Sequence, residues 1–201
     1  SSNADLTDDV LDADVTQIDL NSQTATLTVA QAQKTITDSG SGGSYAIVDS
    51  VSALTGDQGD LSGAASVTAQ LASNASDADL TGVTLDDDVS SIDLNGQAAT
   101  LTVAQALIGT VGTGSFEIVD TVDALNDGTV ASGGSPTNVT AVVQSSDVDL
   151  TDDTLDAGVT QIDLNGQAAT LTVAQAQKTI VENGGSYAIV DSVSALTGDQ
   201  G

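Results

Sequence analysis

The stretch GGSYAIVDSVSALTGDQG fills residues 42–59 and occurs again without a change at residues 184–201. A diverged copy, GTGSFEIVDTVDALNDG, lies between them at residues 112–128. Repetition at a fixed interval is typical of one structural unit stacked on itself, and not of a globular domain built around a pocket. The sequence therefore favours a repeat array over an enzyme.

The repeat interval is about 72 residues, because DLTDDV at Asp5 returns as DLTGVT at Asp79 and as DLTDDT at Asp149. The aromatic residues, two Tyr and one Phe, keep a similar interval: Tyr45, Phe116 and Tyr187. We interpret residues 1–4 as the remnant of a cleaved tag and the end at Gly201 as lying in mid-repeat, as in a piece of a longer protein. The predicted repeats, in one continuous solenoid, are 5–76, 77–146 and a truncated 147–201.

Short segments rich in Val, Ile and Thr recur at intervals of about 22 to 30 residues, which is typical of β-strands in a solenoid. One strand in each winding predicts about eight coils. The predicted strands are 15–20, 45–50, 66–73, 89–94, 116–121, 138–145, 159–164 and 187–192.

The segments between the strands include a helix signal, TVAQAQKTI, at residues 28–36 and 172–180, with TVAQALIGT at residues 102–110. Thr28 followed by Gln31 matches a capping box. A crossover between parallel strands is almost always right-handed, so the coils should wind one way. We predict an elongated α/β solenoid with a parallel sheet on one side and short helices or irregular turns on the other. An all-β solenoid is the alternative.

The charge of the chain limits its partners and its chemistry. There are 29 acidic residues, two cations (Lys34 and Lys178) and no His or Cys, which gives a formal net charge of −27. Binding to nucleic acid or to an anionic membrane requires clustered Lys and Arg, so neither is expected as a partner. No apolar run approaches the ~18 residues of a membrane span, so direct membrane insertion is not expected. Without His or Cys there is no catalytic triad, and we expect no enzymatic activity.

Acidic clusters recur at one phase of the repeat, and they are the candidate metal ligands. Several carboxylates at one turn supply the hard oxygen ligands that calcium prefers, so calcium is the one cofactor that the sequence suggests. Neither an EF-hand loop nor a GGxGxDxUx repeat occurs. The alternative is that these aspartates cap turns and helix N-termini. The candidate ligands are Asp8, Asp9, Asp12, Asp86, Asp87, Asp88, Asp152, Asp153 and Asp156.

Other repeated residues have structural interpretations. In IDLN, the aspartates are predicted to face away from Ile and Leu, with Asn in the following turn. We expect Lys34 and Lys178 to lie on a solvated helix face, paired weakly with nearby Asp. The aromatic positions are predicted to pack in the core or at an edge. The IDLN segments start at Ile18, Ile92 and Ile162.

The segments VTQIDLN, TLTVAQAQ and SYAIVDSVSAL together resemble the long repeats of giant secreted bacterial surface proteins, of the RTX-associated adhesin and large cell-surface protein type. The resemblance extends over the whole chain. It implies type I secretion and an extracellular or cell-surface location for the parent protein. A weaker resemblance is to leucine-rich repeats, because Val15, Ile18 and Leu20 follow the L-x-x-L-x-L spacing.

The function that we expect from the sequence is structural: a module that holds a functional tip away from a cell or covers its surface. Its expected partners are neighbouring repeats of the same chain. Two alternatives remain, a calcium-dependent folding module and a ligand-binding adhesin domain, and the sequence suggests no particular adhesion ligand.

Overall fold

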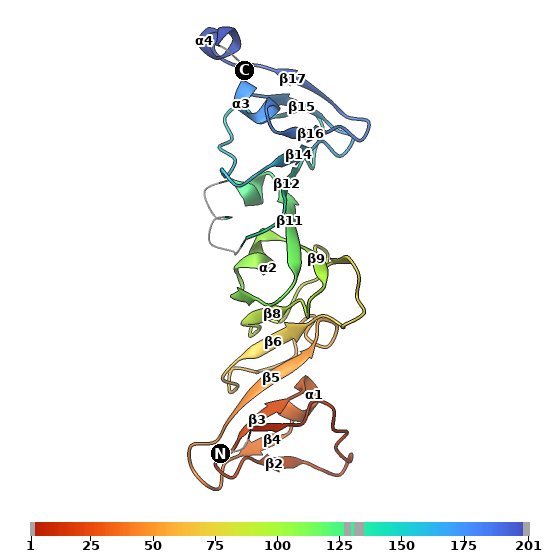
Figure 1. Ribbon diagram of the computed structural model, residues 1–201, viewed down its shortest axis with the longest axis vertical. Coiled ribbons are helices and arrows are strands. Elements are labelled where there is room, and N and C mark those ends of the chain that lie inside the picture. Colours follow the sequence, from red (N-terminus) through yellow and green to blue (C-terminus); the bar gives the residue numbers. More distant parts are fainter. Residues whose placement is uncertain (1–2, 127–129, 131–134, 199–201) are drawn as a thin grey trace. The chain divides into compact units, whose positions relative to one another are not determined.

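The chain folds as a parallel β-solenoid of about nine turns with a few short helices. Our computed structural model describes residues 3–126, 130 and 135–198 (Figure 1). Contacts between Cα atoms divide the chain into two compact units that interleave in sequence. One comprises Ser1–Ala78, Gly82–Ala98 and Ile108–Gly114, and the other Asp79–Thr81, Ala99–Leu107 and Ser115–Gly201.

The first unit contains one six-stranded sheet and one two-stranded sheet. The pairs are parallel, and residues opposite one another in adjacent strands lie about one winding apart in sequence. Asn3 is opposite Thr24, 21 positions later, and Thr68 is opposite Ser91, 23 positions later. The six-stranded sheet has the order β1 (Asn3–Asp5), β3 (Thr24–Leu27), β5 (Ser44–Ser50), β6 (Val67–Gln70), β8 (Ser91–Asp93), β10 (Thr110–Val111), and β2 (Gln17–Asp19) pairs with β4 (Thr35–Thr37).

A second six-stranded sheet, which lies mainly in the other unit, repeats this arrangement. It has the order β16 (Thr179–Val181), β14 (Gln161–Asp163), β12 (Val139–Val142), β11 (Ser115–Thr121), β9 (Ala98–Leu101), β7 (Ala78–Asp79). A separate three-stranded sheet has the order β13 (Val148–Asp149), β15 (Ala168–Leu171), β17 (Ser186–Ile189). Its strands correspond to β1, β3 and β5 of the first six-stranded sheet and to β7, β9 and β11 of the second.

Each six-stranded sheet is shared between two consecutive repeats. A new sheet begins at the strand next to each DLT motif, which is β1, β7 or β13. The sheet that begins with β1 takes β3, β5 and β6 from the first predicted repeat and ends with β8 and β10 from the second. The sequence repeat and the sheet are therefore out of phase, and one repeat alone does not supply a complete sheet.

All eight predicted strands are present, and part of their predicted order is confirmed, because β5, β6 and β8 are neighbours, as are β11, β12 and β14. The rest of the order is different from the prediction. The sequence suggested that residues 15–20 and 45–50 are consecutive windings of one sheet. Instead β2 pairs with β4, and β5 pairs with β3. The extra strands come from segments assigned to turns and helices, such as Thr24–Leu27, and they raise the count from eight coils to about nine.

The helices are shorter than predicted. The capping box is confirmed, because the Thr28 side chain accepts from the Gln31 backbone N–H and Gln31 reaches back to the Thr28 backbone. However, the helix ends after one turn, and the β-branched residues Thr35 and Ile36 continue as β4. The helices are α1 (Val29–Ala32), α2 (Val103–Leu107), α3 (Val173–Ala176), α4 (Val193–Thr197) and a 3₁₀ turn, η1 (Asp123–Leu125).

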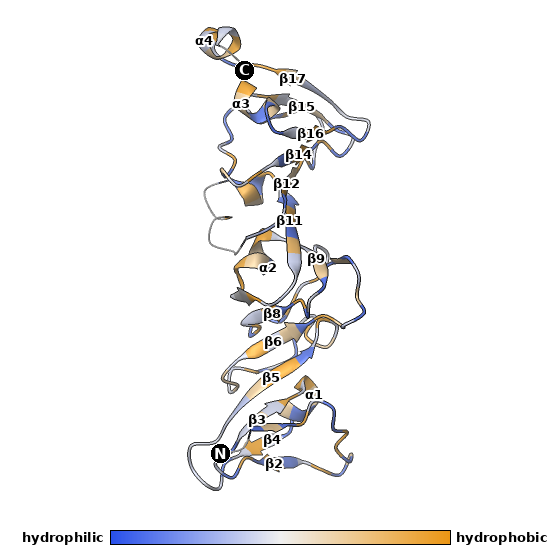
Figure 2. Ribbon diagram, in the orientation of Figure 1, coloured by the Kyte–Doolittle hydropathy of each residue, from blue (hydrophilic) through white to orange (hydrophobic). Residues whose placement is uncertain are grey.

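The core lies on the inward faces of the strands. In β6, Val67 and Ala69 are buried while Thr68 and Gln70 are partly exposed, as the two-residue period of a strand requires. Figure 2 shows the hydrophobic residues along β5 and β6. Ile47 in β5 and Ile92 in β8 also have almost no exposed surface. Within the first unit, the windings thus bury their apolar residues against neighbouring windings.

Candidate functional site

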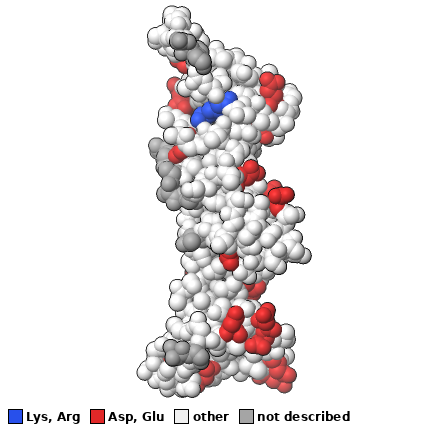
Figure 3. All heavy atoms as spheres, in the orientation of Figure 1, with Lys and Arg blue, Asp and Glu red and all other residues white. Residues whose placement is uncertain are grey.

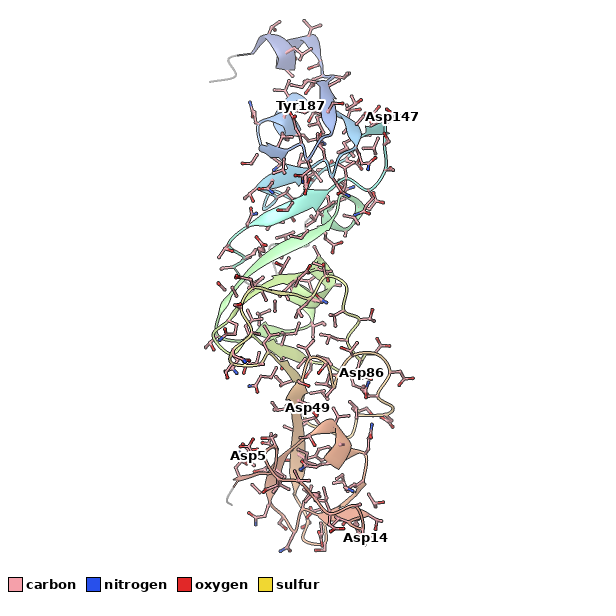
Figure 4. The ribbon with its side chains drawn as sticks, turned by 90° about the vertical axis from the view of Figure 1, so that its right-hand side faces the viewer. Asp5, Asp14, Asp49, Asp86, Asp147 and Tyr187 are labelled. Carbon is pink, nitrogen blue, oxygen red and sulfur yellow. The ribbon has the colours of Figure 1, made fainter. Side chains whose placement is uncertain are left out.

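The predicted calcium ligands lie in the loop between the first and second strands of each repeat. In the first repeat, Asp8, Asp9 and Asp12 are exposed. In the second, Asp86 is buried, with 7% of its surface exposed, while Asp87 is exposed. Figure 4 shows Asp86 in this loop, and Figure 3 shows acidic side chains scattered over the visible face. The corresponding residues of the third repeat are Asp152, which is exposed, Asp153, which is half-buried, and Asp156, which is buried.

One aspartate at this phase caps its own loop in every repeat. The Oδ1 atoms of Asp12, Asp86 and Asp156 accept backbone N–H bonds from the residues two positions later, over 2.9, 3.0 and 2.6 Å. This is an Asx turn, in which a short carboxylate satisfies the backbone of a tight loop. The same residue type at the same phase is therefore explained by local hydrogen bonding.

The second oxygen of the buried aspartates binds the preceding winding. Oδ2 of Asp86 accepts from the backbone N–H of Gln58, 28 positions earlier, over 2.6 Å. Oδ2 of the neighbouring Asp88 accepts from the Leu61 N–H over 2.8 Å, and Oδ2 of Asp156 accepts from Val130 over 3.3 Å. A charged acceptor strengthens such bonds. These carboxylates therefore fasten one loop to the next, which the sequence analysis did not predict.

Calcium binding at these clusters stays a prediction. Among the residues that the structure describes, no group of three or more His, Cys, Asp or Glu side chains is arranged to hold a metal ion. A shallow hollow of about 300 Å³ is lined in part by Asp57, Asp86, Asp87 and Asp88. Asp86 and Asp88 already accept backbone N–H groups, so the geometry favours loop capping at this hollow.

A buried glutamine in each TVAQ segment joins two windings, whereas the sequence predicted only its role in the capping box. Oε1 of Gln31 accepts from the Thr28 N–H over 2.9 Å, which is the capping interaction. Nε2 of Gln31 donates to the carbonyl oxygens of Leu6 and Asp9, over 2.8 and 2.9 Å. Gln175 makes the equivalent bonds to Leu150 and Asp153. The exposed fractions of Gln31 and Gln175 are only 4% and 5%.

The next winding contributes an aspartate to the start of the same helix. The backbone N–H of Val29, the first helical residue, donates to Oδ2 of Asp49 in β5 over 3.0 Å. Val103 and Asp120 repeat this contact over 3.0 Å, as do Val173 and Asp191 over 3.1 Å. The N-terminal N–H groups of a helix have no partner within it, so a carboxylate there satisfies one of them. The D in each IVD triplet was not identified from the sequence, although its exact recurrence was a signal.

The IDLN segments form tight turns as predicted. Asn95 adopts a left-handed backbone conformation, with φ of 52°, and its N–H donates to Oδ1 of Asp93 over 2.9 Å. The pKa of Asp19, the equivalent aspartate in the first repeat, is lowered, chiefly because the Ser39 backbone N–H donates to its carboxylate. These aspartates thus stabilise turns.

The two lysines bind backbone carbonyls. Nζ of Lys34 donates to the Val15 carbonyl oxygen and Nζ of Lys178 to that of Val159, each over 2.6 Å. Both bonds join adjacent windings, 19 positions apart. A solvated helix face with weak pairing to Asp was predicted. The prediction is wrong because each lysine follows the end of its short helix, is half-buried and bonds to a backbone carbonyl.

The three aromatic positions differ in exposure. Phe116 is buried, Tyr45 is half-buried, and Tyr187 keeps 39% of its surface exposed. Burial and the nearby Asp60 carboxylate raise the pKa of Tyr45. Packing in the core or at an edge, as the sequence suggested, describes Phe116 and Tyr45.

The parallel strand pairs and the hydrogen bonds between windings together define a tandem-repeat parallel β-solenoid. Comparisons of the chain with protein-family models, with curated proteins and with solved structures give no match. Within the described part of the chain, the helices are too short and too polar for any of them to cross a membrane.

Proposed function

We propose that this chain is a structural repeat module of a large extracellular bacterial surface or adhesin protein, and that it presents other domains without catalysing a reaction. The observation that carries the proposal is the sharing of each six-stranded sheet between consecutive repeats. In such an array every added repeat completes a sheet begun by the one before it. Length then increases without the need for a new independent core.

The use of the polar side chains supports this proposal. The repeated Gln, Asp and Lys side chains that are singled out by their recurrence bind backbone groups of adjacent windings, as Gln31, Asp86 and Lys34 do. They are therefore engaged in stacking the windings. The formal net charge of −27 would keep such arrays soluble and away from an anionic cell envelope.

Arrays with different numbers of repeats test this function. The chain would be extended by inserting further copies of residues 77–146, and each version would be placed between a cell-surface anchor and an antibody epitope. We expect epitope accessibility and the largest dimension in X-ray scattering to increase with each copy, by about 4.8 Å for each winding. A matched flexible linker of Gly and Ser, with the same number of residues, should give less extension.

Two results would contradict the proposal. One is that a single repeat, residues 5–76, unfolds with the same cooperativity and stability as the three-repeat chain, because stacking would then contribute nothing. The other is specific, saturable binding of the chain to a glycan in an array screen, which would favour the ligand-binding adhesin domain instead.

A further inference from the structure

Residues 92–106 and 162–176 have the same sequence, IDLNGQAATLTVAQA, but the Asn–Gly turn in each copy makes different contacts. The backbone of the two turns is nearly the same, with φ of 52° and 48° at the asparagines and of 76° at both glycines. Windings lie on both sides of each turn, because β8 pairs with β6 and β10, and β14 pairs with β12 and β16 (Figure 1). The different contacts therefore come from the neighbouring windings.

An asparagine that precedes glycine is prone to lose its side-chain amide, because glycine has no Cβ atom to hinder attack by its own backbone nitrogen. The glycine nitrogen attacks Cγ of the asparagine and loses its proton, the Cγ–Nδ2 bond breaks, and ammonia leaves. Water then opens the cyclic imide at one of its two carbonyl groups, which gives aspartate or isoaspartate. The reaction requires a glycine N–H without a strong acceptor and an asparagine side chain that is free to turn toward it.

In the second repeat, both of these groups are held. The Gly96 N–H donates to the Thr113 carbonyl oxygen over 2.7 Å. Nδ2 of Asn95 donates to the Leu71 carbonyl oxygen over 3.2 Å, which ties the side chain to the preceding winding. Asn95 is also half-buried. This turn must open before the reaction can begin.

In the third repeat, the same groups are held loosely. The Gly166 N–H donates to the Glu182 carbonyl oxygen over 3.3 Å, which is longer than the usual range of about 2.7–3.2 Å. Asn165 is exposed, and its hydrogen bonds within the described part of the chain are made by its backbone, with Asp163 and Gln167. Its side-chain amide is therefore free to turn.

The remaining pairs of this kind are more restrained than Asn165. Asn183 also precedes a glycine, but its Nδ2 donates to both carboxylate oxygens of Asp163, over 2.9 and 3.1 Å. In the first repeat Asn21 precedes Ser22, whose Cβ atom hinders the attack.

We propose that Asn165 is a modification site, at which the side-chain amide is hydrolysed spontaneously while the chain stays folded. The product adds a negative charge beside Asp163. An isoaspartate also adds a carbon atom to the main chain, next to the bond from the Leu164 N–H to the Val181 carbonyl oxygen, which is 2.8 Å long. The modification therefore loosens the stacking of this winding on β16. The inference rests on the chemistry of the turn and does not depend on the proposed function.

Incubation of the whole chain at pH 8 and 37 °C tests the proposal. Digestion with pepsin in acid stops the reaction, and tandem mass spectrometry then measures the conversion of each asparagine. We expect Asn165 to convert at least about tenfold faster than Asn95 in the folded chain, because the Asn95 turn must first open. In guanidinium chloride the two should convert at the same rate, since their local sequences are identical.

Two further measurements report on the turn itself. Hydrogen exchange of the folded chain should be faster at the Gly166 amide than at the Gly96 amide, as the lengths of their bonds predict. The melting temperature should fall as Asn165 converts.

Matched variants separate reaction at this turn from reaction elsewhere. Gly166→Ser gives the third repeat the Asn–Ser pair of the first, where Ser22 adopts a φ of 63° in the same turn. It should slow the conversion of Asn165 at least about tenfold, because the added Cβ atom hinders the attack. Gly96→Ser is the control and should leave the conversion of Asn165 unchanged. Circular dichroism checks that both variants are folded.

Three results would overturn the proposal. The first is that Asn95 or Asn183 converts as fast as Asn165 in the folded chain. In the second, the ratio of the Asn165 and Asn95 rates is the same with and without guanidinium chloride, so that the fold has no influence. In the third, Asn165 stays intact in the folded chain after its conversion in guanidinium chloride is complete.

Discussion

The side-chain amide of Gln31 donates a hydrogen bond to the carbonyl oxygen of Leu6, which lies 25 positions earlier, over 2.8 Å. The same relationship joins Gln105 to Leu80 and Gln175 to Leu150, each over 2.7 Å. In each repeat it links the start of a one-turn helix to the turn that follows the first strand of the sheet. A buried amide in this position stabilises the fold because it satisfies two segments of backbone at once.

Replacing Gln31 with Ala should therefore destabilise the chain. We expect a loss of about 2 kcal/mol in the free energy of unfolding, because buried carbonyl groups lose their donor and the helix loses its capping box. The measurement is chemical denaturation monitored by circular dichroism. Gln33→Ala is the control, since Gln33 is exposed in the same segment and its amide bond to the Gln58 carbonyl lies at the surface, so its effect should stay within about 0.5 kcal/mol. Equal effects of the two substitutions would refute the role given to Gln31.

Ser22 has a left-handed backbone conformation, with φ of 63°, in the turn where the other repeats have Gly96 and Gly166, each with φ of 76°. A residue with a Cβ atom is strained there. We expect Ser22→Gly to raise the free energy of unfolding by roughly 0.5–1 kcal/mol, the strain relief exceeding the entropy that glycine adds to the unfolded chain.

The reverse change, Gly96→Ser, serves as the matched control for this turn. No atom lies within 4 Å of the Cβ that it would add, so any loss of stability reports on the backbone alone. We expect Ser22→Gly to raise the denaturant midpoint and Gly96→Ser to lower it. A destabilising Ser22→Gly would mean that the Ser22 side chain contributes to the turn.

The eight predicted strands could be found from the sequence because local composition favours them, whereas strands such as β3 (Thr24–Leu27) could not. Tyr, Ile and Val in β5 and Val and Thr in β6 favour strands without knowledge of their neighbours. Sheet order was predictable only in part, since β5, β6 and β8 are neighbours as expected but β3 also pairs with β5. The choice of β3 as the partner of β5 depends on the length of the intervening winding, and the sequence interval suggested a longer one. The capping box at Thr28 was recognised because it is local, whereas the bond from Gln31 to Leu6 requires the winding itself.

The acidic clusters show the same division between local and distant signals. Their recurrence at one phase was evident from sequence, and so was their potential as oxygen ligands. The partners that they bind were not evident, because the Gln58 N–H that donates to Asp86 lies 28 positions away. A residue that recurs because it fastens adjacent loops has the same sequence signature as one that recurs because it binds an ion.

Removing Asp86 distinguishes these two roles. We expect Asp86→Ala to lower the free energy of unfolding by about 2 kcal/mol, because two backbone N–H groups lose their acceptor. Asp87→Ala is the control, as Asp87 is exposed in the same loop. For loop capping, the melting temperature in 5 mM calcium should equal that in chelator. A higher melting temperature with calcium, abolished by both substitutions, would instead support the predicted calcium sites.

The DLT motif predicts how stability changes in acid. In each repeat an aspartate, Asp5, Asp79 or Asp149, accepts from both the hydroxyl and the backbone N–H of the Thr two positions later. The Thr hydroxyl, and then the N–H, lower the pKa of each carboxyl below its ordinary value of 3.8. A lowered pKa in the folded state means that stabilisation is present above pH 3.8, and that it is lost as the pH falls through the folded-state pKa.

Replacing the three threonines tests whether this stabilisation is lost as the pH falls. The variant with Thr7→Val, Thr81→Val and Thr151→Val should be less stable than the parent chain at pH 6, and the difference should shrink as the pH falls below about 4. Denaturation is measured in 0.5 M salt, because salt screens the general repulsion among carboxylates. Without salt, this repulsion would weaken in acid in both chains and would obscure the difference. The exposed Thr16 provides the control, Thr16→Val, with no pH-dependent difference expected. A difference that stays constant from pH 6 to pH 2.5 would show that the threonines act through packing and not through the carboxylates.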